Sequence, residues 1–378
     1  MIDFLITAVL FIAVLGILVC IHEFGHFIAA KWSGVRVDEF GFGFPPRLFG
    51  VKFGDTLYSL NAVPLGGFVR IKGIAGEEIE EVDETKHETN KHRFHDNDSF
   101  AVQPFWKKLG ILFAGIGMNF FLAAILFSIA FSLGVKTQIS QNTMTSADPE
   151  IIVTQVRSGS PAEKAGITTA DQITAKNGTK ISAVKDLQGF SEKDLGTPVV
   201  LSVLSGKTTK DITLSPAEIV TDSGERYIGM GIGLAAVETV QYPPHLAIVQ
   251  GVKETALSTV GIFQGFGLLF VRLFSDTGSA AQDLAGPIGI AKITRGAADL
   301  GISSLVQFMA ILSVNLAVFN FLPIPALDGG RITMAVLTAI RKKPINEKTE
   351  TLVHSIGFLF LLMLVIAVTY QDIVKIIQ

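Results

Sequence analysis

The chain has 378 residues, of which 49% are hydrophobic and 17% are charged, and its mean hydropathy is +0.48. Soluble globular domains carry about 25% charged residues, so this composition excludes a disordered, a collagen-like and an ordinary soluble protein. The net charge of −3 gives no basic footprint for a nucleic-acid partner. The single cysteine, Cys20, cannot form an internal disulfide. The sequence therefore predicts a membrane protein.

Four apolar runs are long enough to cross a bilayer, which takes about 20 residues of helix. They are residues 4–21, 109–135, 305–327 and 352–369. A fifth run, 256–274, is weaker because glycines, Gln264 and Arg272 interrupt it. The first run lacks the basic start and the cleavage site of a signal peptide, so we interpret it as a retained span.

Basic residues in short loops predict the orientation, because such loops stay on the cytoplasmic side. They follow the first run, precede the second, and separate the third from the fourth: Lys31, Arg36, Lys107, Lys108, Arg341, Lys342, Lys343 and Lys348. All lie on one side only if the fifth run does not cross. Residues 256–274 are therefore expected to form an interfacial helix on the outer surface. This arrangement has four spans, an outside amino terminus, residues 31–108 inside and residues 136–300 outside.

Two segments on the inner side differ in character. Residues 77–98 are polar and rich in acids, and we expect a solvated loop. Its His87, His92 and His95 could bind a metal, although a mobile surface tract is the preferred interpretation. Residues 40–73 contain strand-like pieces broken by glycine and proline. They predict a small hairpin lying against the membrane or dipping into it, where backbone must be buried in protein or line a wet cavity.

Residues 148–234 have a globular composition with strand, turn and short-helix signals. Ser160-Pro161 opens a short helix, and Asn177-Gly178 marks a turn. The stretch resembles a bacterial PDZ domain, a module that binds peptide ends or strands by adding a strand to its sheet. A PDZ-shaped spacer that binds no peptide is the alternative.

The predicted fold class is a polytopic α-helical membrane protein of about four transmembrane helices, with a membrane-associated β-hairpin region and an inserted α+β PDZ-like domain. The first membrane half covers 1–135 and the PDZ-like domain covers 136–235. An interfacial helix and linker follow at 236–300, and the second membrane half covers 301–378.

The strongest catalytic signal is the sequence HEFGH at residues 22–26, at the end of the first run. Two histidines four residues apart share one face of a helix, so both imidazoles can bind one zinc ion while the glutamate acts on its water. Ionisable residues in or beside a span are costly and are functional by default. A polar helix end or a structural histidine pair is the alternative. Cys20 lies on another face of the helix and is interpreted as a packing residue.

A catalytic zinc usually takes a third protein ligand and keeps one position open. The best candidate is Asp328, because the predicted orientation brings it to the same side of the membrane as the end of the first span. Pro323 and Pro325 break the helix before it. Read alone, Asp-Gly-Gly is more typical of a turn. Neither His354 nor the loop histidines lie in a sequence pattern that would support them as the third ligand.

A family resemblance follows from these motifs taken together. HEFGH, LNAVPLGGFVRIKG at 60–73, the PDZ-like insert, GPIGIAKI at 286–293 and NFLPIPALDGGRI at 320–332 resemble the site-2 protease family (peptidase M50-like), specifically its bacterial regulated intramembrane zinc proteases. The resemblance covers nearly the whole chain in the order of the family. One departure is Ile116, where the second span of the family usually has a proline. Its absence removes a helix kink and no ligand.

The resemblance implies a zinc ion held by His22, His26 and Asp328, with Glu23 as general base. It also implies that Asn320 helps to position the scissile segment. The membrane-associated β elements would grip substrate as an added strand through Gly41, Gly43, Gly67, Phe68 and Val69.

The expected function is a zinc-dependent endopeptidase that hydrolyses peptide bonds within the transmembrane segments of single-span proteins, such as anti-sigma factors or remnant signal peptides. The implied location is the bacterial cytoplasmic membrane, with the active site towards the cytoplasm and the PDZ-like domain outside. The expected partners are these substrates, peptide termini or extracytoplasmic segments at the PDZ-like domain, and the lipid bilayer. A non-catalytic, zinc-stabilised scaffold with a recruiting PDZ domain is one alternative, and a transporter is another. Neither alternative requires Glu23 between the two histidines.

Overall fold

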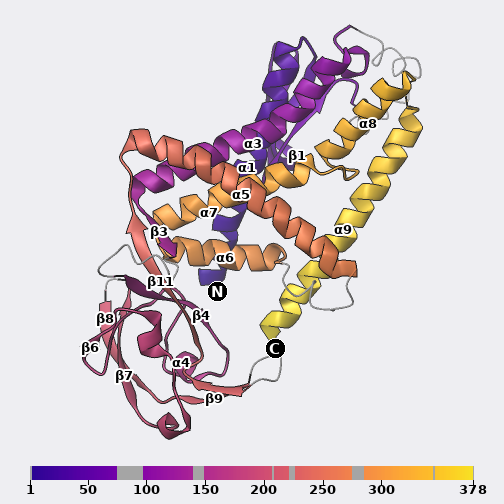
Figure 1. The fold of residues 1–378 in the computed structure, drawn as a ribbon. Coiled ribbons are helices and arrows are strands. Elements are labelled where there is room, and N and C mark those ends of the chain that lie inside the picture. Colours follow the sequence, from indigo (N-terminus) through magenta and orange to yellow (C-terminus); the bar gives the residue numbers. More distant parts are fainter. Residues whose placement is uncertain are drawn as a thin grey trace. The chain divides into compact units, whose positions relative to one another are not determined.

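The computed structural model describes residues 2–74, 97–138, 149–206, 208–220, 226–274, 285–343 and 345–377 (Figure 1). The chain divides into two units. The helical unit comprises Met1–Ile129, Pro244–Arg295 and Leu305–Gln378, and the β unit comprises Ala130–Pro243 and Gly296–Ser304. His87, His92 and His95 of the predicted polar loop lie outside the described residues.

Long helices dominate the helical unit. The described helices of 13 residues or more are α1 (Ile2–Trp32), α3 (Phe105–Leu133), α5 (Pro244–Phe274), α6 (Pro287–Asp299), α7 (Ile302–Phe321), α8 (Asp328–Arg341) and α9 (Glu347–Ile377). Among the described residues, five helices are long and apolar enough to cross a membrane: α1, α3, α5, α7 and α9. The prediction of a helical membrane protein is thereby confirmed. α3 runs without interruption through Ile116, where the family usually has proline.

α5 contains the segment 256–274 that the sequence predicts to lie on the outer surface. The helix begins earlier, at Pro244, and its most apolar window has a mean hydropathy of 1.2, against 1.9 to 2.8 for the other four helices. Gly251 lies so close to α3 that a Cβ there would overlap Ala124 and Ser128. α5 therefore packs tightly on α3 at this point. The arrangement of four spans with α5 along the surface stays a prediction.

The expected hairpin is formed by β1 (Val37–Phe53) and β2 (Thr56–Ile71), and it folds back on itself. Residues 37–44 pair with 63–71, and residues 39–42 also pair with 57–60. The remainder of β1 pairs with the first part of β2, from Phe53 opposite Thr56 to Arg47 opposite Asn61. The two strands thus build a sheet of four adjacent segments, with 63–71 at one edge.

Two glycines bring this edge of the sheet against α1. Gly66 has a φ of +107° and lies against Val19, while Gly67 lies against the backbone of Cys20. A side chain at Gly66 would push the sheet away from the helix, and one at Gly67 would overlap the Gly41 carbonyl of the neighbouring segment. An apolar cluster continues the contact between α1, the sheet and α3: Ala30, Val35, Val37, Val69, Ile71, Ile74 and Ile111. Segment 63–71 is therefore held beside the carboxyl half of α1.

The β unit contains a seven-stranded sheet in the order β3-β11-β4-β5-β7-β8, with β6 paired to β5. Its strands are β3 (Val135–Gln138), β4 (Glu150–Val156), β5 (Gln172–Lys176), β6 (Thr179–Lys180), β7 (Val199–Ser205), β8 (Thr208–Leu214) and β11 (Ile232–Val240). A separate pair is formed by β9 (Ala217–Val220) and β10 (Arg226–Gly229). Short helical turns occur at η1 (Phe100–Val102) in the helical unit, and at α4 (Pro161–Lys164), η2 (Val184–Leu187) and η3 (Glu192–Asp194) in the β unit.

Local signals in the β unit are confirmed. The Ser160 side chain accepts a hydrogen bond from Glu163 N and caps α4, and Asn177 and Gly178 both have positive φ in the predicted turn. The core is apolar and includes Ile151, Val153, Ile173, Leu201 and Val203.

The carboxyl-terminal helix is tied to the start of α6 by one buried carboxylate. Asp372 on α9 accepts hydrogen bonds from Gly289 N at 2.8 Å and from Gly286 N at 3.3 Å. These amides belong to the GPIGIAKI motif. A carboxylate at a helix start satisfies amides that have no partner within the helix.

Candidate metal centre

Two histidines project from one face of α1, as their spacing predicts. His22 and His26 are 5% and 6% exposed, and their Nε2 atoms lie 3.2 Å apart. α1 continues past them to Trp32, so the motif lies within a regular helix and not at a frayed end. This rigidity fixes the direction of both imidazoles.

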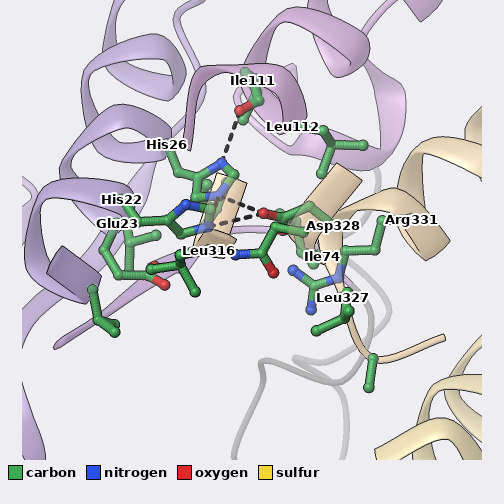
Figure 2. A pocket seen from close by; sticks show the side chains of 15 residues that line it. His22, Glu23, His26, Ile74, Ile111, Leu112, Leu316, Leu327, Asp328 and Arg331 are labelled. Carbon is green, nitrogen blue, oxygen red and sulfur yellow. Dashed lines mark hydrogen bonds and ion pairs between the residues drawn. The ribbon is translucent and has the colours of Figure 1, made fainter. Parts of the chain in front are cut away.

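Asp328 reaches the same point from the other end of the chain. Its Oδ2 lies 2.9 Å from His22 Nε2 and 3.2 Å from His26 Nε2 (Figure 2). The Asp-Gly-Gly sequence does not form an isolated turn, because Asp328 begins helix α8. Gly329 and Gly330 lie against the carbonyls of Leu322 and Ile324, where any side chain would collide with backbone. The two glycines thus let α8 fold back closely on the end of α7.

A stripe on α3 supports the histidines from behind. His26 Nδ1 lies 2.8 Å from the Ile111 carbonyl oxygen, and His22 Nδ1 lies 3.0 Å from Asn119 Nδ2. Gly115, halfway between them, leaves the space that His26 fills, since a Cβ there would overlap the imidazole. Residues 111, 115 and 119 are spaced by four and share one helix face. This face sets the orientation of both rings.

A cavity of about 220 Å³ opens beside these residues (Figure 2). It is lined by Val19, His22, Glu23, His26, Val69, Ile71, Ile74, Ile111, Leu112, Leu316, Asn320, Ala326, Leu327, Asp328 and Arg331. The structure therefore brings Glu23, Asn320 and Val69 of the predicted site residues to the same cavity as the three candidate ligands.

The other predicted β residues lie outside that lining. Gly41 is opposite Phe68 in the sheet, and Gly67 is opposite Phe42. Gly43 has a φ of +78° and lies close to the Val63 carbonyl. These residues shape the sheet next to the cavity without facing into it.

Several residues of the site were missed by sequence reasoning. The prediction included neither Arg331, one turn after Asp328 on α8, nor the supporting roles of Gly115 and Asn119 on α3. A usable signal for Asn119 existed, because an amide within an apolar span needs a partner inside the protein. The Ile111 carbonyl carries no signal of its own in a sequence.

The arrangement fits a zinc ion. His22, His26 and Asp328 each offer one ligand atom, and the three atoms lie within 4.8 Å of one another. Two imidazoles and a carboxylate form a typical ligand set for a catalytic zinc, and they leave a fourth position open. His26 Nδ1 can donate to the Ile111 carbonyl, which leaves its Nε2 available to a metal.

Asn119 provides a further test of this fit. Its Oδ1 is buried and has no hydrogen-bond partner in the part of the chain that the structure describes. When His22 binds a metal through Nε2, its Nδ1 carries the proton and must donate it. A half-turn of the Asn119 amide places Oδ1 opposite this proton and satisfies both groups.

Known proteins are similar in sequence to this chain over nearly its full length. The profile of Peptidase family M50 matches residues 10–364. A Clostridium perfringens protein named "Putative zinc metalloprotease CPE1693" is 33% identical over 357 residues, covering 94% of this chain and 95% of that protein. Proteins with the same descriptive name from Agrobacterium fabrum and Staphylococcus aureus are each 30% identical, covering 96% and 98% of this chain and 94% and 99% of theirs. The chain belongs to Peptidase family M50, the site-2 protease family of metalloproteases.

Proposed function

We propose that this metalloprotease is a zinc-dependent intramembrane endopeptidase that hydrolyses peptide bonds within the transmembrane segments of single-span proteins. The observation that carries the proposal is the position of the three candidate ligands and Glu23 around one cavity beside an apolar helix long enough to cross the bilayer. Anti-sigma factors and remnant signal peptides are proposed substrate classes, by analogy with the family alone.

The two tryptophans of the chain support a site below the membrane surface. Trp32 ends α1, Trp106 begins α3, and they are 87% and 77% exposed. Lys107 Nζ donates to the Ser33 carbonyl at 3.0 Å, which holds the two helix ends at one level. Exposed tryptophans and lysines at helix ends typically mark the membrane interface. His22 and His26 lie ten and six residues before Trp32, or about 15 and 9 Å along the helix axis.

The proposed chemistry divides between the metal and the side chains that line the cavity. A zinc ion held by His22, His26 and Asp328 supplies a Lewis acid that polarises a peptide carbonyl and acidifies a water molecule. Glu23 accepts a proton from this water while the water oxygen bonds to the carbonyl carbon. Glu23 then gives the proton to the leaving nitrogen as the C–N bond breaks. Asn320 lines the same cavity and is proposed to donate a hydrogen bond to the substrate backbone.

The β sheet is proposed to hold the substrate in an extended form. Segment 63–71 pairs with residues 37–44 on one side, and no described strand pairs with residues 63–70 on the other. Val69 and Ile71 of this segment line the cavity. A substrate strand added there would recover backbone hydrogen bonds that it loses when its helix unwinds. Gly41, Gly43, Gly67 and Phe68 would shape this edge.

The β unit is proposed to be a PDZ-like domain outside the cell that binds peptide termini or extracytoplasmic segments. Within the described part of the chain, β3 pairs with residues 237–240 of β11, and β4 pairs with residues 232–237. Residues 232–236 thus have no described strand on the β3 side, and an added peptide strand would bind there. Such binding would recruit substrates or exclude those that still carry a large outer domain.

Replacing the general base tests the proposal. We expect Glu23→Gln to retain zinc and to lose cleavage of a model single-span substrate in detergent, because an amide cannot accept the proton from water. Glu192→Gln, an exposed glutamate of the β unit, is the matched control and should cleave as the parent does. Full activity of Glu23→Gln would overturn the assignment of the base. Zinc in every variant but cleavage by none of them, across several single-span substrates, would favour the non-catalytic scaffold.

A further inference from the structure

The loop that delivers Asp328 is held by an unusual set of contacts. Within it, Ile324 N donates to the Leu322 carbonyl and Leu327 N donates to the Ile324 carbonyl. Ala326 has a φ of +77°, a left-handed conformation that is unfavourable for any residue with a Cβ. Ala326 and Leu327 also line the cavity. A strained residue thus lies two positions before the carboxylate ligand.

The acceptor for the Ala326 amide comes from α9. Ala326 N donates to His354 Nδ1 at 2.9 Å. No pattern in the sequence supports a role for His354, yet its imidazole accepts a hydrogen bond from the backbone amide of this strained residue. Because Nδ1 accepts, the proton of the neutral ring is on Nε2, which is buried and has no partner among the described residues. Among the described residues, the hydrogen bond at Nδ1 is therefore the one that orients the ring.

The backbone of α9 comes unusually close at the same point. Gly357, one turn after His354, lies so near Pro325 that a Cβ would overlap its ring and its carbonyl. Apart from this point and the contact of Asp372 with the start of α6, α9 is largely exposed, since only 6% of its most apolar window is buried inside the protein. A glycine and a hydrogen-bonding histidine on one face of a largely exposed helix mark a specific docking point for the loop.

We propose that His354 is a positioning residue that holds the 325–327 loop in its strained form and so places Asp328 against His22 and His26. The inference rests on the proposed metal site and deepens it. His354 is not itself a lining residue of the cavity, and it acts through Ala326, whose amide it binds. Loss of its acceptor would let Ala326 relax to negative φ and draw Asp328 away from the histidines.

Zinc affinity of the full-length protein, measured by competition with a chelator, tests this inference apart from catalysis. We expect His354→Gln to weaken zinc binding by about 10-fold, as residues that orient metal ligands typically do. His354→Asn should stay close to the parent, because its amide oxygen occupies nearly the position of Nδ1 whereas that of glutamine reaches the position of Nε2. Cobalt absorption should report altered tetrahedral geometry in the glutamine variant only.

Ala326→Gly provides a rescue, since glycine adopts positive φ without steric cost. Added to His354→Gln, it should recover most of the lost zinc affinity. Equal zinc affinity for the parent, His354→Asn and His354→Gln would overturn the positioning role while leaving the proposed function intact. A well-folded parent that binds no zinc would instead overturn the proposed function, and this inference with it.

Discussion

The two units of the molecule use buried polar groups in different ways. In the β unit, the buried core is apolar, and the buried polar side chains bind backbone close by: Ser160 accepts from Glu163 N, and Asp171 accepts from Thr168 N. In the helical unit, buried threonines such as Thr255 also bind nearby backbone, but the buried polar groups of the metal centre join distant parts of the chain. His22 meets Asp328, and Asn119 meets His22.

This difference follows from the two solvents. In water, burial of apolar surface drives folding, and buried polar groups serve mainly to satisfy local backbone. In lipid, the surroundings are as apolar as a leucine side chain, so burial of apolar surface does not distinguish the inside of a bundle from its outside. Helix α9 illustrates this, with Phe358, Phe360 and Met363 each at least 60% exposed. Polar contacts and close glycine packing then carry much of the specificity of the helical unit.

The largest expected effect is that of adding one methyl group on α3. Gly115→Ala would place a Cβ against the His26 imidazole, whose Nδ1 is held by Ile111. We expect His26 to be displaced, with zinc affinity and cleavage falling on the order of 100-fold. Zinc affinity and cleavage of a single-span substrate are the measurements.

Gly117→Ala is the matched control for this change. Gly117 lies on the same helix, two residues further on, and a Cβ there meets no atom within 4 Å among the described residues. We expect this variant to retain zinc and activity. A parent-like zinc affinity in Gly115→Ala would break the comparison, because it would show that close glycine packing is not needed at this site.

A core substitution in the β unit should lower stability without changing zinc affinity. Leu201 is fully buried among apolar side chains of the sheet. Leu201→Ala should lower the free energy of unfolding of the β unit by about 2–5 kcal/mol, from lost burial and the cavity left behind. Hydrogen exchange of the β7 amides in the full-length protein measures this loss, while zinc affinity should stay at the parent value. Loss of zinc would mean that the two units do not keep separate energetic roles.

Sequence reasoning located the long apolar helices because their signal is long and simple. The extent of α8 was harder. Asp328-Gly329-Gly330 has poor helix propensity and is typical of a turn, but the two glycines are required where α8 packs on the carbonyls of Leu322 and Ile324. That requirement comes from tertiary contact and is absent from local propensity.

The two histidine ligands could be predicted because they form a local sequence pattern, whereas the residues that support them do not. His22 and His26 are recognisable by a spacing of four on one helix. Gly115 does not, because the chain reads Gly115-Ile116-Gly117 and no local rule says which glycine faces His26. The His354 contact joins residues 28 positions apart through a backbone amide, and such an amide has no signature in a sequence.

The smallest expected effect concerns a local polar contact in the β unit. Asp186 accepts hydrogen bonds from Ser182 N and Ala183 N at 3.0 and 2.9 Å at the start of η2. These backbone amides hold its pKa below the usual value, with a smaller contribution from Lys185 and Lys176. A carboxyl whose pKa is depressed by folding adds stability above its unfolded pKa of about 3.9, and this contribution is lost as the pH falls through the lower folded value.

Asp186→Asn should therefore lower the thermal stability of the β unit slightly at pH 7, and this difference should shrink as the pH falls below about 4. Amide I infrared melting of the strands in the full-length protein is the measurement. Zinc affinity should not change at pH 7, because the backbone amides that the Asp186 carboxylate binds lie within four residues of it. A difference that grew towards low pH would have the wrong sign for a contact that needs the charged carboxylate. A shift in zinc affinity would show that a local polar contact of the β unit acts at a distance, as those of the helical unit do.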